Sequence, residues 1–470
     1  MPSVSGGGDP DQWLSVEERR EWGRSRRSLL PRSALADIVT GPPRPDPVTL
    51  LSSQDVSRIP DLVPIRYGRM LASPSAFYRG AALIMASDLS NGPHTGLTTQ
   101  LCGDAHLGNF GLFGSPERNL VFDINDFDET LPGPWEWDLK RLAGSLAIAA
   151  RDNGFDRETR DQVVRSCARA YRERMAALAT MGELEVWYAQ ARIDDALLAG
   201  LRPQAADTVR RIADKARSRD NLQALSKLTE VVDGRHRLIS NPPLLIPIEE
   251  LVDQSRVKSY EQKMAALVDA YRKTLNVSVR VLARRFRYAG MARKVVGVGS
   301  VGLRTWVVLT LGRDGGDPLM LQVKEARPSV LEAYLGPSVH SNAAQRVVVG
   351  QRMTQSSGDI MLGWLRTVGP DGHRGDYYIR QLHDWKGSAS AESMNPPAMT
   401  DYGRSCAHVL AGAHARTGDR IAIAAYLGKG ETADLAISHF AATYAKQNQR
   451  DYETLRAAAR ENRVHPIVER

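Results

Sequence analysis

Leu101–Leu142 reads LCGDAHLGNFGLFGSPERNLVFDINDFDETLPGPWEWDLKRL, and this stretch decides the fold. Two runs that favour strands, Phe110–Phe113 and Asn119–Ile124, flank a Gly-Ser-Pro turn and predict a hairpin. Polar side chains gather in the two loops that meet at one end of this hairpin: Asp104, His106, Asn109, Asp123, Asp126 and Asp128. Carboxylates placed together repel one another unless a cation lies among them. The residues therefore predict a divalent metal site with oxygen ligands, which suits Mg²⁺ better than zinc.

The spacing of three residues narrows the chemistry. Asn109 follows Asp104 by five positions, and Asp123 comes fourteen positions after Asn109. Kinase-type phosphotransferases use this order, with a catalytic Asp, an Asn on the metal, and a metal-binding Asp after a strand pair. A polar turn in an Asx-rich hairpin is the alternative interpretation. Three positions at matched spacing favour a catalytic loop in which Asp104 is the general base.

The wording GDAHLGN…VFDINDFD resembles the aminoglycoside-phosphotransferase branch, whose catalytic loop reads G-D-x-H-x-x-N and whose metal loop reads I-D-x-x-D. The resemblance implies that Asn109 and Asp123 hold Mg²⁺, with Asp126 as a second ligand or an alternative to Asp123. His106 joins Asp104 in the catalytic loop, where we expect it to shape the loop through hydrogen bonds. Asp138 stands where a helix N-cap belongs, and the resemblance implies that it braces the catalytic loop.

Composition sets broad limits on the protein. The chain has 470 residues and a formal net charge of +8, which suits anionic ligands such as a nucleotide. Nucleic acid is a minor alternative, because no zinc-finger spacing or other recognition motif is present. No run resembles a signal peptide or is long enough to span a bilayer, so we expect a cytoplasmic protein without membrane contact. The cysteines, few and far apart, agree with a reducing compartment: Cys102, Cys167 and Cys406.

Changes in amino-acid composition and patterning along the chain predict four regions. They are a basic, partly disordered arm (1–60), the catalytic and metal loops with a helical lobe (61–288), a β-rich nucleotide-binding lobe (289–388), and a linker with helices returning to the helical lobe (389–470). In the second region, the stretch 157–287 reads as almost wholly helical.

A short segment leads into the acidic stretch. Ser75–Leu89 predicts one amphipathic helix, capped by Ser73 or Ser75. Three arginines lie near this helix: Arg66, Arg69 and Arg79. Each of them either binds phosphate or neutralises the charge of the carboxylates, and we expect two of the three to neutralise charge.

A glycine-rich turn opens the β-rich region, and it reads Gly297-Val298-Gly299-Ser300-Val301-Gly302. A dinucleotide site is the common alternative for such a G-x-G-x-x-G. Here a strand, Arg304–Leu311, follows in place of a helix, which favours a kinase-type loop over nucleotide phosphates. Lys324 ends the third strand of this region, where a kinase carries the Lys that holds the α- and β-phosphates.

Kinases pair that Lys with a Glu on the next helix. The next predicted helix, Asn342–Gln355, contains no Glu, so Glu325 and Glu332 are the nearer candidates. An inner strand then leads to a predicted hinge at Gln381, Leu382 and His383, whose backbone is expected to meet adenine. The following helix, Thr400–Asp419, carries His414 near its end, as kinase-like enzymes do just before the catalytic loop.

The motifs follow a kinase in content but not in order. The chain runs catalytic loop, metal loop, helical lobe, glycine-rich loop, Lys, hinge and pre-catalytic helix, which is a rotation of the ordinary order. Such a permutation is physically allowed, because chain termini lie at the surface and are often close together. The segments CGDAHLGNFG, FDINDFDETLPGPWEWDLKRLAGSL, RKVVGVGSVG, LQVKEARPS, QRVVVGQR and YYIRQLHDWKGS resemble DUF2252, a bacterial family of unknown function. The expected fold is α+β: a bilobed, circularly permuted protein-kinase-like fold with a small antiparallel β lobe and a larger helical lobe.

The predicted function is phosphoryl transfer from ATP, with Mg²⁺, to a hydroxyl on an unknown small molecule or protein. A variant of this prediction transfers nucleotide in place of phosphate. The missing helix Glu motivates a second hypothesis, a nucleotide-binding pseudokinase with a regulatory or scaffold role. A third hypothesis is a metal-dependent hydrolase that uses only the acidic hairpin.

Overall fold

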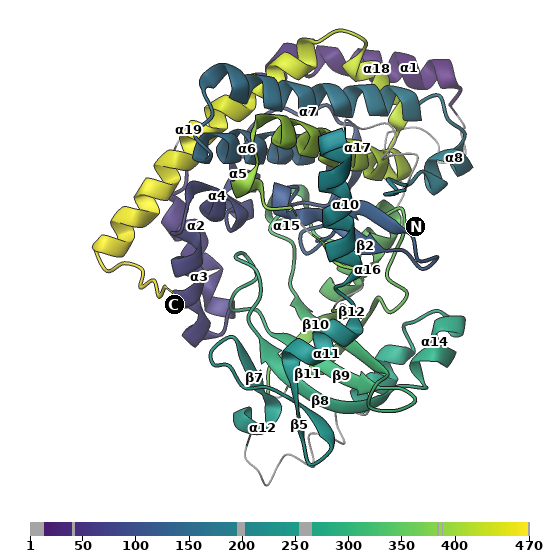
Figure 1. Cartoon of the computed structure of the whole chain (residues 1–470). Coiled ribbons are helices and arrows are strands. Elements are labelled where there is room, and N and C mark those ends of the chain that lie inside the picture. Colours follow the sequence, from purple (N-terminus) through teal and green to yellow (C-terminus); the bar gives the residue numbers. More distant parts are fainter. Residues whose placement is uncertain are drawn as a thin grey trace.

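The computed structural model describes residues 14–39, 43–194, 203–252, 266–369, 371–382, 385–387 and 389–468. The fold is α+β. Long helices gather in one part, which lies at the top of Figure 1, and the largest sheet lies at the opposite end. Among the described residues, no helix is both long enough and apolar enough to cross a bilayer.

The helical part is built from long helices around one large apolar core. Its main members are α6 (Trp135–Asp152), α7 (Arg157–Leu178), α17 (Pro396–Thr417), α18 (Arg420–Leu427) and α19 (Thr432–Arg460). Side-chain caps start three of them: Asp156 for α7, Asn395 for α17 and Asp419 for α18. Helix α6 is buried along nearly its whole length, because α7, α17 and α19 pack around it. This central position makes α6 a rigid support for whatever it contacts.

The basic N-terminal stretch is folded from Leu14 onward and is not a free arm. Helix α1 (Val16–Ser25) starts with a capping box between Ser15 and Glu18 and packs on α18. Arg27 donates to the carbonyl oxygens of Tyr426 and Ala425 at the end of α18. These carbonyls have no partner within their helix, so the arginine completes the helix end. The basic charge of this segment thus serves packing.

Short helices continue from this segment toward the acidic stretch. They are α2 (Pro47–Ser53), α3 (Val63–Met70), α4 (Pro74–Arg79) and α5 (Ala82–Ser90). The single helix predicted for Ser75–Leu89 is therefore two helices, which break at Gly80 and Ala81. Ser73 caps α4 by accepting from the Ala76 N–H.

The largest sheet has six antiparallel strands in the order β11-β12-β10-β9-β8-β7. Its strands are β7 (Leu245–Pro247), β8 (Arg287–Lys294), β9 (Thr305–Leu311), β10 (Pro318–Ala326), β11 (Gly363–Val368) and β12 (Arg374–Gln381). One face carries Trp306 and Leu321 against Tyr271, and the other carries Val307 and Met320 against Leu225. Both faces are covered, which agrees with the apolar character of β9 and β10. Between β10 and β11 lie the short α15 (Glu332–Leu335) and α16 (Ala343–Thr354).

The stretch 157–287 divides between the two parts, which corrects the prediction of one helical lobe. Helices α7 and α8 (Glu183–Tyr188) belong to the helical part, whereas α11 packs on β10 and β7 extends the large sheet. The elements on the sheet side or leading to it are α10 (Pro203–Arg217), α11 (Asn221–Leu228), β5 (Thr229–Val232), β6 (Arg235–Leu238), α12 (Ile248–Leu251) and α14 (Val277–Ala283). Amphipathic helices that cover a sheet have the same periodicity as helices in a bundle, so the pattern did not separate them.

Two small antiparallel pairs carry the acidic loops. The predicted hairpin is β2 (Phe110–Gly114) with β3 (Leu120–Ile124). A second pair joins β1 (Thr98–Leu101), just before the first loop, to β4 (Leu131–Pro134), just after the second. The two pairs therefore fix both ends of each acidic loop.

Candidate active site

Asp138 braces the backbone just before Asp104. Its carboxylate accepts from the Cys102 N–H at 2.8 Å and from the Gly103 N–H at 3.1 Å. His414 Nε2, from α17, lies 3.3 Å from the same carboxylate. Asp138 sits within the first turn of α6 and is not its N-cap, so the cap prediction is wrong. The bracing role implied by the resemblance is the one its hydrogen bonds perform.

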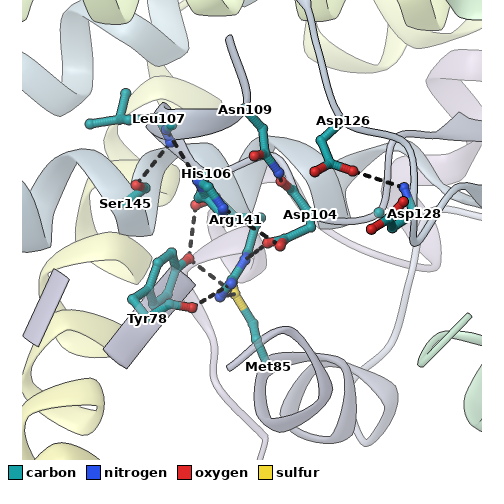
Figure 2. Close-up of polar contacts among 12 residues, drawn as sticks. Tyr78, Met85, Asp104, His106, Leu107, Asn109, Asp126, Asp128, Arg141 and Ser145 are labelled. Carbon is teal, nitrogen blue, oxygen red and sulfur yellow. Dashed lines mark hydrogen bonds and ion pairs between the residues drawn. The ribbon is translucent and has the colours of Figure 1, made fainter. Parts of the chain in front are cut away.

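Two further side chains on α6 hold the same loop. Arg141 Nε donates to Asp104 Oδ1 at 2.9 Å, and Arg141 Nη2 donates to the Tyr78 carbonyl at 2.6 Å (Figure 2). One turn further on, Ser145 Oγ accepts from the Leu107 N–H at 3.1 Å. With Asp138, these residues follow an i, i+3, i+7 spacing on one helix face. Arg141 and Ser145 are not among the residues predicted from the sequence, although their spacing from Asp138 was a usable signal.

The loop after Asp104 is closed by its own polar groups. His106 Nδ1 accepts from the Gly108 N–H at 3.1 Å, and Asn109 Nδ2 donates to the Asp104 carbonyl at 2.8 Å. Burial lowers the pKa of His106 to about 4, so the imidazole is neutral near pH 7. His106 therefore shapes the loop. The amide nitrogen of Asn109 is engaged, which directs its amide oxygen to other partners.

Asp123 and Asp126 lie in different environments. Asp123 is 2% exposed and accepts from both the backbone N–H and the hydroxyl of Ser356, at 2.9 and 2.8 Å. It does not line the cleft described below, because its position within β3 turns it toward the segment after α16. Asp126 follows the end of β3 and faces the cleft. Of the two metal-ligand candidates, Asp126 is the one placed beside Asn109 and Asp104, which corrects the prediction for Asp123.

Lys324 reaches the acidic loop from β10. Its ammonium forms an ion pair with Asp128 and lies 3.7 Å from Asp126 Oδ2. Tyr378 donates to the second oxygen of Asp128 at 2.8 Å. Burial alone would lower the pKa of Lys324, but the two carboxylates outweigh it and raise that pKa. Burial likewise acts to raise the pKa of Asp126, yet the Lys324 charge leaves it lowered.

Neither Glu proposed as the partner of Lys324 contacts it in the structure. Glu325 pairs with Arg304 at 3.4 Å and with Arg327 at 3.1 Å, since adjacent strand residues face opposite ways. Glu332 accepts from the N–H groups of Ser329 and Ser338. The carboxylate that pairs with Lys324 is that of Asp128, in the loop between β3 and β4.

Helix α16 supplies a buried arginine to the same loop. Arg346 donates to the carbonyl oxygens of Asp128, Thr130 and Arg327, at 2.7, 2.6 and 2.7 Å. It therefore joins the acidic loop to the end of β10. No local pattern marks this arginine in the sequence, because its acceptors are backbone atoms of distant segments.

The glycine-rich turn connects β8 and β9. Its first and last glycines adopt positive φ, +68° at Gly297 and +89° at Gly302, which only glycine tolerates readily. Arg69 donates to the Gly297 carbonyl at 2.5 Å, and Arg58 donates to the carbonyl oxygens of Gly299 (2.8 Å) and Val301. Val301 is buried against the N-terminal helices. The turn is thus fixed to the segment that precedes the acidic stretch.

A cleft of about 750 Å³ separates the glycine-rich turn from the acidic loops. Predicted site residues line it together: Asp104, His106, Asn109, Asp126, Gly297, Val298, Gly299 and Ser300. Lys324 lies just beneath, joined to the cleft through Asp126 and Asp128. Val301 and Gly302 belong to the turn but do not line the cleft.

The predicted hinge does not offer free backbone donors. The Gln381 N–H donates to Asp359 at 2.6 Å, and the Leu382 N–H donates to the Met320 carbonyl at 2.9 Å. Leu382 is buried beside Leu225 of α11. Adenine recognition by these two N–H groups is therefore not supported by the structure, because α11 and the segment after α16 occupy their surroundings. His383 lies outside the described residues.

The donors near the cleft fit a magnesium ion that a phosphate group helps to hold. Within the described ranges, no group of three or more His, Cys, Asp or Glu side chains is arranged to bind a metal ion. Mg²⁺ commonly takes one or two protein oxygens and completes its shell with water and substrate phosphates. Asn109 and Asp126 provide such a pair of oxygen donors.

Fold and site together define an α+β protein whose acidic cleft is faced by a glycine-rich turn and a buried lysine. The chain belongs to the family described as an uncharacterized protein conserved in bacteria, DUF2252, whose model matches residues 58–458. This match confirms the family resemblance drawn from the motifs. No curated protein and no solved structure matches the chain.

Proposed function

We propose that this protein is an ATP- and Mg²⁺-dependent phosphotransferase of kinase-like type, acting on a hydroxyl acceptor. One observation carries the proposal: Lys324 meets Asp126 and Asp128, which belong to a loop nearly two hundred residues earlier in the chain (a separation of 196 residues for Asp128). A basic residue on the third strand after a glycine-rich turn and an acidic metal loop are the two halves of a kinase site. Their contact supports a single nucleotide site.

In an ordinary kinase, the chain runs directly from the pre-catalytic helix into the catalytic loop. The packing at the corresponding junction of this protein supports the permuted order. The last turn of α17 lies against β1, which leads directly to Asp104. Thr417 Oγ1 accepts from the Gln100 N–H at 3.1 Å, and Gly418 packs so closely on Thr98 that no side chain fits there. The pre-catalytic helix and the catalytic loop are therefore neighbours in space although they are far apart in the chain.

In the proposed mechanism, each residue has one role. Asp104 accepts the proton of the acceptor hydroxyl, and Arg141 keeps its carboxylate in place. Asn109 and Asp126 hold Mg²⁺, which neutralises the negative charge of the phosphates when bound. Lys324 and the backbone of the glycine-rich turn orient the phosphates.

Two alternatives rest on weaker ground. The pseudokinase hypothesis came from the missing helix Glu, and Asp128 provides Lys324 with a carboxylate partner. The hydrolase hypothesis needs only the acidic hairpin and leaves the contact with Lys324 without a purpose.

The test is the thermal shift of the purified protein with Mg²⁺–ATP. A ligand that binds only the folded state stabilises it by about 2.7 kcal/mol at a hundredfold excess over Kd. We expect a clear shift in the wild type and a much smaller one in Asp126→Asn and Lys324→Met. Asp123→Asn is the matched control, because this carboxylate faces away from the cleft: it should lower the starting Tm and keep the shift.

The outcomes separate the hypotheses. A wild type without any shift at saturating Mg²⁺–ATP would refute nucleotide binding. A shift that survives Lys324→Met would favour the hydrolase. A shift without ATP-dependent modification of any acceptor would favour the pseudokinase.

A further inference from the structure

Two arginines flank the tip of the glycine-rich turn at the cleft wall. A methyl group placed on Gly299 would meet the Arg79 carbonyl oxygen at 3.2 Å. One placed on Gly108, in the catalytic loop, would meet Arg79 Nε at 3.5 Å. Arg79 therefore spans from the glycine-rich turn to the catalytic loop. Arg58 holds the other side of the turn through the Gly299 and Val301 carbonyls.

Neither guanidinium forms an ion pair with a carboxylate in the part of the chain that the structure describes. Arg66 pairs with Asp55 at 2.7 Å, and Arg69 binds the Gly297 carbonyl, whereas the Arg79 side chain has no hydrogen bond or ion pair with any described residue. Of the three arginines noted in the sequence, Arg79 is thus the one free to bind an anion.

Arg58 is more deeply placed. It is 8% exposed, donates only to backbone carbonyls, and has an Nε without a partner. Burial, with the nearby charge of Arg66, lowers its pKa to about 9. The charges of Asp55 and Glu129 offset this only in part. A buried cation without a directly paired carboxylate is costly, so this environment favours an anionic ligand.

We propose that Arg58 and Arg79 form a clamp for the terminal phosphate of a nucleoside triphosphate, with Arg79 contacting the phosphoryl group as it moves. The inference rests on the proposed function and adds residues to it. In the transfer, the acceptor oxygen forms a bond to the γ-phosphorus while the bond from that phosphorus to the β–γ bridging oxygen breaks. The hydroxyl proton goes to Asp104, and ADP leaves with the bonding electron pair. The guanidinium groups stabilise negative charge on the phosphoryl oxygens.

The experiment compares two ligands by calorimetry: the non-hydrolysable imido analogue of ATP and ADP, each with Mg²⁺. Removing a charged contact from the terminal phosphate should weaken the triphosphate about tenfold to a hundredfold and leave ADP unchanged. Arg79→Ala is the main variant, because the Arg79 side chain has no bond to the described residues and its loss should not disturb folding. Arg79→Lys should recover part of the difference, since it restores charge without the fork.

Arg374→Ala is the matched control. Arg374 is an exposed arginine on the sheet side of the cleft and has no hydrogen-bond or ion-pair partner among the described residues. This variant tests whether the loss of any positive charge near the cleft weakens binding as Arg79→Ala does. We expect its affinities for the ATP analogue and for ADP to equal those of the wild type.

The results distinguish the two proposals. If the wild type binds neither nucleotide, the proposed function fails and the clamp fails with it. If the wild type binds both, and Arg79→Ala weakens both equally or neither, the clamp alone is refuted and the nucleotide site stands. The clamp alone is also refuted if Arg374→Ala weakens binding of the triphosphate as much as Arg79→Ala does.

Discussion

Arg141 Nε lies 2.9 Å from Asp104 Oδ1, so the carboxylate at the base of the cleft is held by a helix of the core. Tyr78 completes the arrangement, because its hydroxyl donates to the Arg141 carbonyl and its ring lies 3.7 Å from the guanidinium carbon. If Asp104 is the general base of the proposed function, a carboxylate fixed in this way would meet its substrate in one orientation. Orientation of this kind contributes strongly to rate.

Asp104→Asn should abolish phosphoryl transfer while nucleotide still binds. The amide keeps the size of the side chain but cannot accept the proton, and loss of a general base lowers rates by about 10²- to 10⁴-fold. Calorimetry with Mg²⁺–ATP should give an affinity close to that of the wild type. A turnover rate in Asp104→Asn equal to that of the wild type would exclude Asp104 as the base.

Asp138→Ala should destabilise the fold more than the loss of one short side chain would suggest. The change leaves the buried N–H groups of Cys102 and Gly103 without an acceptor and removes the carboxylate beside His414. Each unsatisfied group costs about 1–3 kcal/mol, so we expect a loss of about 3–5 kcal/mol in the free energy of unfolding, measured in urea. Asp138→Asn retains one acceptor and should lose less. Equal losses in the two variants would contradict the bracing role.

The ion pair of Lys324 with Asp128 should appear as coupling in a double-mutant cycle. The partners are Lys324→Met and Asp128→Asn, made singly and together. Because the pair is largely buried, breaking it from either side leaves an uncompensated charge, and the double variant should lose less than the sum. We expect a coupling energy of about 1–3 kcal/mol from denaturant unfolding. Strict additivity would mean that the contact adds nothing to stability.

Glu129 should make stability depend on pH. Burial raises its pKa to about 7, from 4.5 in the unfolded chain. The folded state therefore binds more protons between these two values, and its stability falls as pH rises through that window. The shift corresponds to about 3 kcal/mol at most.

The measurement is the free energy of unfolding of Glu129→Gln minus that of the wild type, from pH 4 to 8. The difference should be small at pH 4 and should grow in favour of the variant up to about pH 7. The Glu129 side chain accepts from the Val330 N–H at 2.7 Å, and Gln can still accept this bond. A difference that stays flat across the range would show that folding does not shift the pKa of Glu129.

Local patterns predicted much of this molecule. The hairpin of β2 and β3, the three strands from β8 to β10, and α16 and α17 all occur where periodicity and turn residues placed them. These elements depend on short-range signals. The family followed from motifs of the same kind.

What failed depends on contacts between distant segments. The choice between Asp123 and Asp126 needs the face that β3 turns to the cleft, which Ser356 and the segment after α16 decide. The partner of Lys324 is Asp128, and no rule of sequence spacing links two residues on separate parts of the fold. The hinge prediction likewise lacks support, because the Gln381 N–H donates to Asp359, a residue that local patterns did not connect with it.

The close packing of Gly418 on Thr98 also has a genetic consequence. The segment between these residues begins and ends at the same point in space, so its contacts do not depend on where translation starts within it. A chain that joined residue 418 to residue 98 through a short linker would keep the contacts made within this segment, whereas α18, α19 and the helices before β1 would still have to be supplied from outside it.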